Sequence, residues 1–155
     1  HKAVRLCRIT TDTARRHAAT QLRQLPTLEG SLSGLSPLDI AQKFYTDRPD
    51  GLCGNEDCGQ MSAWYAFAAM GFYPVDPVQG HYELTSPLWR ESRIALPNGK
   101  VFTLTAEGLS DKNCYIKSVK VNGQPYTKSF LTYDLILSGA KVTLEMTDQR
   151  GICWY

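Results

Sequence analysis

The order of apolar and polar residues divides the chain into a helical part and a later part that alternates like strands. Residues 38–45 place apolar side chains on one helical face, and the turn sequence at 48–51 ends that segment. Residues 60–70 are apolar around the whole helix, which is typical of a helix buried on all sides, and Gly71 is a natural stop. Because so short a chain can hardly surround this helix, we expect it to be an inner helix of a larger all-helical barrel.

Alternation of apolar and polar residues after Pro77 predicts an antiparallel β region. Pro97-Asn98-Gly99 predicts a hairpin turn, and Asn122-Gly123 and Gly139-Ala140 predict two further turns. The predicted strands cover residues 82–85, 93–96, 101–106, 115–121 and 141–146. Together with the helical part, this pattern predicts the fold class α+β.

The two ends of the chain differ in character from the rest. Residues 1–37 begin with an arginine- and threonine-rich stretch that has no clear period, and they end in a Ser/Gly-rich run that is typical of a linker. This segment stays unassigned, and we expect it to be disordered or foreign, for example from a shifted reading frame. The remaining predicted segments are the helical part 38–76, the antiparallel β region 77–150 and a tail at 151–155.

The loop 50–60, which leads into the apolar helix, concentrates the side chains that could do chemistry. It holds three carboxylates, two side-chain amides and three glycines within eleven positions. A helix N-terminus keeps nearby carboxylates ionised, which suits a general base or a metal ligand. Spacing by itself favours a structural interpretation, with Asp57 as the N-cap of the helix and Asp50 as a turn residue. The loop lacks the ligand pattern of an EF-hand.

Charge and cysteine content narrow the classes of function. A net charge of +2 over 155 residues does not indicate a nucleic-acid partner, and no apolar run approaches the roughly 18 residues of a membrane helix. The five cysteines are an odd number, so they cannot all pair within the chain. Cys53 and Cys58 either bridge the loop or remain free thiols. No second Cys/His pair has zinc-finger spacing, and the scattered histidines are expected at the surface.

A long stretch around this loop resembles glycoside hydrolase family 92. Residues 48–75, RPDGLCGNEDCGQMSAWYAFAAMGFYPV, are similar to a signature near the end of these enzymes, and the similarity extends over residues 40–148. Segments that carry it further are 82–87, 98–100, 115–123 and 131–136. The resemblance implies an N-terminal β-sandwich domain packed on an (α/α)6 barrel. Residues 60–70 would then be the last buried helix of the barrel, in a fragment of a larger two-domain enzyme.

The resemblance also implies an activity and a set of site residues. It implies the C-terminal part of a calcium-dependent exo-α-mannosidase that hydrolyses α-mannosidic linkages of mannans or N-glycans with inversion. Carried over by position, Asp57 is the general base, and Asn55 stands where some relatives have a second Asp. Glu56 lies between them and is the weaker candidate for the base. Asp50 and Gln60 are candidates for shaping the substrate site.

Other catalytic parts are expected outside this chain. The general acid of the family is a Glu upstream of the motif, and the calcium ligands, including an Asn-Glu pair, also lie upstream and are not recognisable here. We therefore predict no metal ligand within this chain, and we expect the fragment to need the upstream part of the same enzyme. His1 is not an initiator methionine, so the chain is expected to be cut or mis-started. The resemblance implies a periplasmic or secreted protein.

Two alternatives to an enzyme remain open. A non-catalytic β module that packs against or binds carbohydrate would present exposed aromatic side chains on the strand half. Trp64 is expected in the core. Trp89, which precedes a predicted strand, is the better candidate for an exposed ring, although core packing is the favoured interpretation of this residue too. An inactive remnant is the second alternative, which the unusual ends of the chain favour.

Overall fold

The computed structural model describes residues 37–52, 56 and 58–149. The two ends of the chain and most of the segment 53–57 lie outside these residues. The expectations for the N-terminal segment and for the tail therefore stay predictions.

Two helices form the first part of the fold, as the spacing of apolar residues predicted. They are α2 (Pro37–Phe44) and α3 (Gln60–Met70). The N–H of Gly71 donates to the carbonyls of Phe67 and Ala68, both at 3.1 Å, and its φ of 95° suits the glycine that ends a helix. A small apolar core joins the two helices and contains Ile40, Ala41, Met61, Trp64 and Ala68. The prediction that Trp64 is a core residue is confirmed.

The surface of α3 is only partly covered within this chain. Trp64 and Ala69 are buried, but Ala63 is exposed and Tyr65 and Ala66 are half-buried. This partial coverage agrees with the expectation that so short a chain cannot surround the helix, and its burial in a larger barrel stays a prediction. The coverage is partial because α2 and the first strand pack against α3 and leave its other sides open to solvent.

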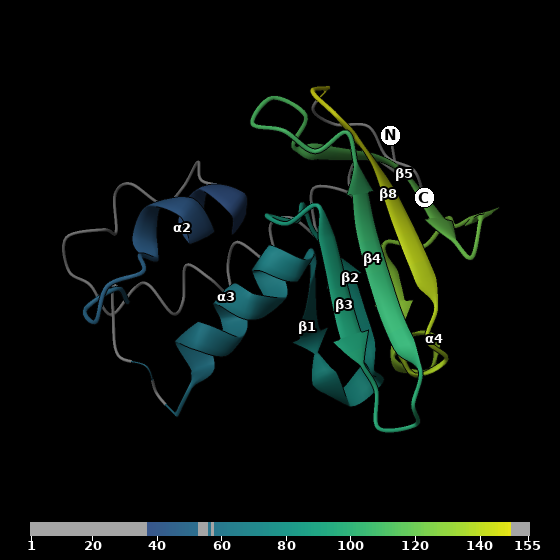
Figure 1. Cartoon of the computed structure of the whole chain (residues 1–155), viewed down its shortest axis with the longest axis horizontal. Coiled ribbons are helices and arrows are strands. Elements are labelled where there is room, and N and C mark those ends of the chain that lie inside the picture. The colour runs from purple at the N-terminus through teal and green to yellow at the C-terminus, as the bar shows by residue number, and fades with distance from the viewer. Residues whose placement is uncertain (1–36, 53–55, 57, 150–155) are drawn as a thin grey trace.

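Two β-sheets form the strand-rich half, which lies beside α3 (Figure 1). The first has the strand order β1-β2-β7, with β1 (Phe72–Asp76), β2 (His81–Leu84) and β7 (Phe130–Thr132). The second has the order β3-β4-β8-β5-β6, with β3 (Glu91–Ala95), β4 (Val101–Glu107), β8 (Lys141–Thr147), β5 (Tyr115–Val121) and β6 (Gln124–Pro125). A 3-10 helix η2 (Pro77–Gln79) and a short helix α4 (Tyr133–Leu137) complete the elements. The fold class α+β is confirmed.

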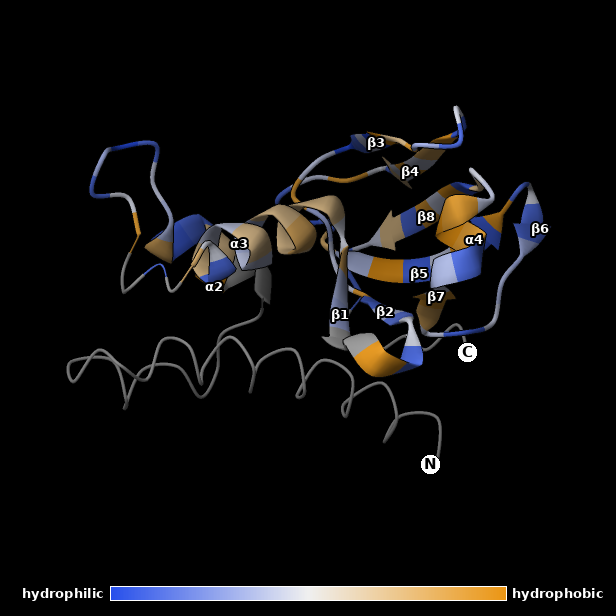
Figure 2. Ribbon diagram, turned by 90° about the horizontal axis from the view of Figure 1, so that it is seen from below, coloured by the Kyte–Doolittle hydropathy of each residue, from blue (hydrophilic) through white to orange (hydrophobic). Residues whose placement is uncertain are grey.

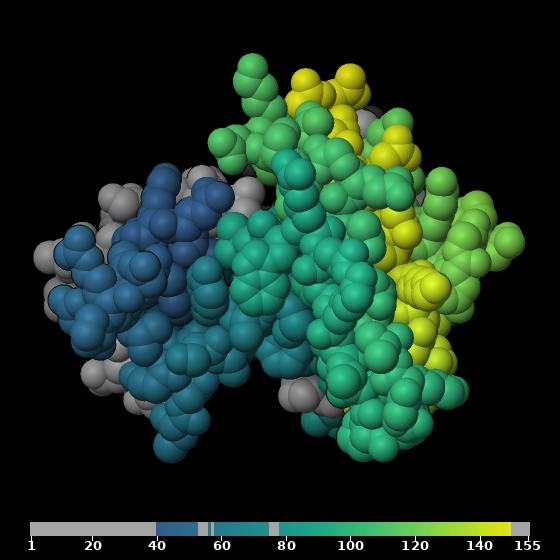
Figure 3. Space-filling view, in the orientation of Figure 1, coloured from purple at the N-terminus to yellow at the C-terminus, as the bar shows by residue number. Residues whose placement is uncertain are grey.

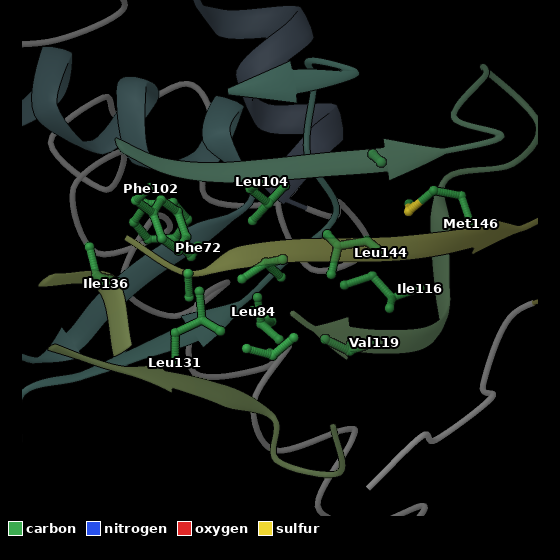
Figure 4. Packing of buried hydrophobic residues seen from close by; sticks show 14 residues of the cluster. Phe72, Leu84, Phe102, Leu104, Ile116, Val119, Leu131, Ile136, Leu144 and Met146 are labelled. Atoms are coloured by element: carbon green, nitrogen blue, oxygen red, sulfur yellow. The ribbon is translucent and has the colours of Figure 1, made fainter. Parts of the chain in front are cut away.

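The apolar faces of the two sheets meet in one core, shown in Figure 4. Alternate residues of β4 and β8 point into it, as the period of two in a strand requires. From the five-stranded sheet the core takes Phe102, Leu104, Ala106, Ile116, Val119, Val121, Val142, Leu144 and Met146. From the other side it takes Phe72, Leu84 and Leu131. The strand half is therefore a small sandwich whose stability comes mainly from this buried apolar area.

The strand β8 corrects the prediction of a wholly antiparallel region. It pairs in parallel with β4, where Leu104 is opposite Val142, and antiparallel with β5, where Val119 is opposite Leu144. β4 and β5 run in opposite directions and leave one strand position between them. A strand that fills this position must be parallel to one neighbour and antiparallel to the other. The arrangement follows from topology, which alternation along the sequence does not contain.

Several short elements, among them β1, β7 and α4, are absent from the predictions. β1 pairs with β2 directly after α3, although Pro74 and the short length give its sequence a weak strand signal. β7 has three residues. Tyr133 and Asp134 begin α4, where the hydroxyl oxygen of Thr132 accepts from the Leu135 N–H at 3.3 Å. This cap stabilises a single helical turn whose sequence has no helical period.

The predicted turns are confirmed in detail. Gly99 has a φ of 76°, and the Lys100 N–H donates to Oδ1 of Asn98 at 3.0 Å between β3 and β4. Asn122 and Gly123 have φ values of 50° and 81° between β5 and β6. Two positive values in succession are the signature of a type I′ hairpin, which favours Asn-Gly.

The end of α3 is fastened to the sandwich by main-chain hydrogen bonds. The Thr85 N–H donates to the carbonyl of Gly71 at 2.9 Å, and the Leu88 N–H donates to the carbonyl of Ala69 at 3.0 Å. A Cβ on Gly71 would lie 2.9 Å from Cβ of Pro87, so glycine also permits this close approach. The helices consequently form a lobe held at one side of the sandwich (Figures 2 and 3).

The carboxyl group of Glu83 on β2 should make the free energy of unfolding depend on pH. Burial raises the pKa of its carboxyl group, and the hydrogen bond from the Ser129 hydroxyl (3.3 Å to Oε2) together with nearby His81 offsets this only in part. A glutamate pKa that is higher in the folded state makes stability fall as pH rises through that pKa. We expect Glu83→Gln to remove this fall.

At neutral pH, Glu83→Gln should raise the free energy of unfolding by less than about 1 kcal/mol, because solvent screens a half-exposed carboxylate. The measurement is chemical unfolding of the complete protein between pH 4 and pH 8. Glu107→Gln, at an exposed position of β4, is the matched control and should leave the pH dependence unchanged. A lower stability of Glu83→Gln at neutral pH would contradict the prediction.

Candidate functional site

A closed turn leads from α2 into the acidic loop. Tyr45 and Leu52 form an antiparallel bridge, and the Thr46 N–H donates to the carbonyl of Gly51 at 3.0 Å. A Cβ on Gly51 would lie 2.1 Å from the carbonyl oxygen of Thr46, so no other residue fits this position without moving the backbone. The observed conformation of the turn, from which the loop begins, therefore requires glycine at this position.

The ring of Tyr45 holds this turn against α3. It stacks on Trp64 with a centroid separation of 5.6 Å and on Tyr65 with a separation of 4.9 Å. The Tyr45 hydroxyl also lies 3.9 Å from the sulfur of Met61. Aromatic stacking of this kind adds to the area that the rings bury. Both ends of the acidic loop are consequently anchored to one helix.

The other end of the loop enters α3 through two left-handed residues. Cys58 has a φ of 61°, and Gly59, which is the N-cap, has a φ of 89°. The Gln60 N–H donates to the main-chain carbonyl of Glu56 at 2.9 Å. The Ser62 N–H donates to Oε1 of the Glu56 side chain at 3.2 Å. The capping acceptor of the helix is therefore the Glu56 carboxylate.

The structure locates three of the five predicted site residues. Asp50 is exposed on the closed turn, Gln60 is the exposed first residue of α3, and Glu56 is half-buried against the first turn of the helix. Asp57 and Asn55 lie outside the described residues. The structural interpretation of Asp57 as the N-cap is wrong, because Gly59 occupies that position.

The local electrostatics favour negative charge. The unpaired N–H groups of an α-helix give its first turn a partial positive charge, which stabilises a nearby carboxylate. Oε2 of Glu56 is buried, and none of the described residues donates a hydrogen bond to it. In residues 37–52, 56 and 58–149, no three His, Cys, Asp or Glu residues come together as a metal site.

The remaining expectations concern cysteines and aromatic residues. Cys58 is an exposed free thiol and Cys114 is a half-buried one, while Cys53 lies outside the described residues. Trp89 is 45% exposed and Tyr133 is 51% exposed, so the expectation that Trp89 packs in the core is wrong. Across this part of the chain, the helices are too short to span a bilayer.

Comparison with known proteins identifies the family. The profile of the Glycosyl hydrolase family 92 catalytic domain matches residues 38–148, which include the loop, α3 and both sheets. The chain belongs to glycosyl hydrolase family 92. An uncharacterized secreted glycosidase of Arthroderma benhamiae is 33% identical over 106 residues, which are 66% of this chain and 13% of that protein.

Solved structures of family 92 share the fold of this segment. An α-mannosidase of Bacteroides thetaiotaomicron is 45% identical with a TM-score of 0.69, over 73% of this chain and 15% of that one. An inverting mannosidase of the same species is 39% identical with a TM-score of 0.67, again over 73% and 15%. The chain thus spans about a seventh of the length of these relatives. Its sheets correspond to the C-terminal β domain of the family.

Sequence reasoning did not find the capping role of Glu56. The available signal was its position, four residues before the first residue of an apolar helix, but a glutamate at that distance has no fixed orientation. The two left-handed residues, one of them the non-glycine Cys58, turn the chain so that the Glu56 side chain reaches the Ser62 N–H. A positive φ at a cysteine is uncommon and cannot be expected from sequence.

Proposed function

We propose that the complete protein is an inverting, calcium-dependent exo-α-mannosidase that acts on mannans or N-glycans, and that this chain is its C-terminal part. The observation that carries the proposal is the match of the loop, α3 and the sandwich, in order, to family 92. The solved relatives named above include α-mannosidases, one structure holds mannoimidazole, and another is described as inverting.

The proposed reaction uses two carboxyl groups on opposite sides of the glycosidic bond. Asp57 takes a proton from water as that water attacks the anomeric carbon, and an upstream glutamic acid protonates the leaving oxygen. The two carboxyl groups of an inverting enzyme stand about 6.5–9.5 Å apart, which leaves room for the water. The partial positive charge at the start of α3 favours an ionised base in this loop.

The open sides of α3 support the proposed (α/α)6 barrel. Ala63, Tyr65 and Ala66 leave apolar surface uncovered on a helix that is otherwise packed. Burial of such surface contributes about 25 cal/mol per Å². We propose that upstream helices of the same enzyme cover it, and that the cleft between them and the loop binds the mannoside.

Calcium stays a proposal without a site in this segment. The described residues contain no cluster of three acidic, histidine or cysteine side chains. Calcium usually takes six to eight oxygen ligands from carboxylates, carbonyls and water. The resemblance to the family is the reason for placing the ligands in the upstream part, and no step of the reaction is derived from the ion here.

The stereochemistry of the first product tests the proposal. The complete protein is mixed with an aryl α-mannoside, and the anomers are followed by proton NMR before they equilibrate. We expect β-mannose to form first, because attack by water from the face opposite the leaving group inverts the anomeric carbon. Release of α-mannose first, or no hydrolysis of α-mannosides beside hydrolysis of another glycoside, would contradict it.

A secreted or periplasmic location is proposed for the complete protein. The Arthroderma benhamiae relative is described as secreted, and the substrates proposed here are carbohydrates of cell surfaces and glycoproteins. The competing interpretation of a non-catalytic carbohydrate module draws support from the exposed rings of Trp89 and Tyr133. Binding of mannan without hydrolysis, lost in Trp89→Ala, would favour that module over the enzyme.

A further inference from the structure

We infer that Glu56 is a positioning residue that fixes the backbone next to the catalytic base, and that it is not the base itself. The inference rests on the proposed function, in which Asp57 takes the proton from water. It concerns the residue that directly precedes Asp57 in the sequence.

Two separate hydrogen bonds fasten Glu56 to the first turn of α3. Its main-chain carbonyl accepts from the Gln60 N–H at 2.9 Å, and Oε1 of its side chain accepts from the Ser62 N–H at 3.2 Å. Both donors belong to the first turn of the helix, where N–H groups have no partner within the helix. The residue is therefore held through its backbone and through its carboxylate at the same time.

The same contacts argue against Glu56 as a base. A general base must reach a water molecule at hydrogen-bond distance from the reacting carbon. One oxygen of Glu56 is engaged by the Ser62 N–H, and the other, Oε2, is buried. Oε1 is therefore engaged by a main-chain donor and Oε2 is shielded from solvent. The carboxylate faces the helix that it caps.

The backbone that follows Asp57 is fixed as well. Cys58 and Gly59 both adopt positive φ values, and Gly59 directly precedes α3. Asp57 is covalently bonded between Glu56 and Cys58, so we expect a shift of either neighbour to reach it. A displacement of about 1 Å at a catalytic group can lower the rate by about 10²-fold. Glu56 is thus placed where a lost contact would disturb catalysis without removing a reacting group.

Three substitutions in the complete enzyme separate positioning from proton transfer. Glu56→Gln keeps an oxygen that can accept from Ser62 and should retain kcat within about 5-fold. Glu56→Asp keeps the charge, but it is one methylene shorter and cannot reach the Ser62 N–H, so kcat should fall by about 10- to 100-fold. The kcat of Glu56→Ala should fall by a similar factor. KM should change by less than about 3-fold in all three, because the substrate contacts remain.

The pH dependence of kcat distinguishes the general base from a residue that positions it. The acidic limb of kcat reports the base, so it should keep its midpoint in Glu56→Gln and disappear in Asp57→Asn. Glu107→Gln, an exposed glutamate on β4, is the matched control and should behave as the parent enzyme.

Each outcome decides between the two roles. A kcat of Glu56→Gln as low as that of Asp57→Asn would make Glu56 the base and overturn the inference. Normal kcat in Glu56→Asp would also overturn it, because the contact with Ser62 would then be dispensable. If Glu56→Ala fails to fold, the Gln and Asp variants still decide the question. Normal kcat in Asp57→Asn, or a parent enzyme inactive on α-mannosides, would refute the proposed function instead.

Discussion

Asp57→Asn in the complete enzyme is expected to lower kcat by about 10²–10⁴-fold, which is the contribution of a positioned general base. Asparagine has nearly the same size and shape as aspartate, but its amide cannot accept a proton from the attacking water. KM should change little, because the side chain acts on water and not on the sugar. The measurement is steady-state hydrolysis of an aryl α-mannoside.

A matched variant shows whether the loss is specific to Asp57. Asp111→Asn removes a carboxylate from the exposed loop between β4 and β5 and should leave kcat unchanged. Circular dichroism and the thermal midpoint of Asp57→Asn should equal those of the parent, since Gly59 and Glu56 supply the N-cap and the capping acceptor of α3. A kcat of Asp57→Asn near that of the parent enzyme would exclude Asp57 as the base.

The sequence predicted best those elements whose local signals agree. Residues 60–70 form α3 within the predicted bounds, because an apolar, alanine-rich run ends at a glycine that adopts a left-handed conformation. β5 also has its predicted bounds, with an Asn-Gly turn directly after it. In both cases the residues that end the element have their own physical reason to do so, and tertiary contacts do not oppose it.

Elements that depend on distant partners could not be predicted. β7 has three residues and exists because β2 pairs with it, with Tyr82 opposite Leu131. The parallel pairing of β8 with β4 depends on an open position between two strands that are far apart in sequence. The role of Glu56 depends on two left-handed residues that bring its carboxylate to the helix. The acidic loop itself was visible from composition, whereas its chemistry came from resemblance to a family.

The helix α3 connects the acidic loop to the sandwich. N–H groups of its first turn donate hydrogen bonds to Glu56. At its other end, the carbonyls of Ala69 and Gly71 accept hydrogen bonds from the strand half. A helix of 11 residues is about 16 Å long at a rise of about 1.5 Å per residue. The sandwich thus fixes one end of a rigid element whose other end sets the loop of the proposed base. If the proposed function is correct, a change in the sandwich is therefore expected to reach the loop through α3.

Phe72→Ala is expected to give the largest loss of stability in this part of the protein. Phe72 follows the C-cap of α3 and is 1% exposed. Its ring contacts Phe67 of α3 edge-on, with centroids 5.7 Å apart, and Phe102 of β4 at 5.9 Å. Truncation removes the ring that packs against both the helix and the sandwich, and it leaves a cavity. Such changes cost about 3–5 kcal/mol.

The measurement for Phe72→Ala is thermal and denaturant unfolding of the complete protein. Phe72→Leu, which keeps most of the apolar volume, should lose considerably less, and Val101→Ala, at a 47% exposed position of β4, should change stability by less than about 0.5 kcal/mol. Because the lost contacts join α3 to the sandwich, the folded Phe72→Ala enzyme should also show a lower kcat from looser placement of the loop. Unfolding of Phe72→Ala at the midpoint of the parent would show that the helix and the sandwich are joined by other contacts.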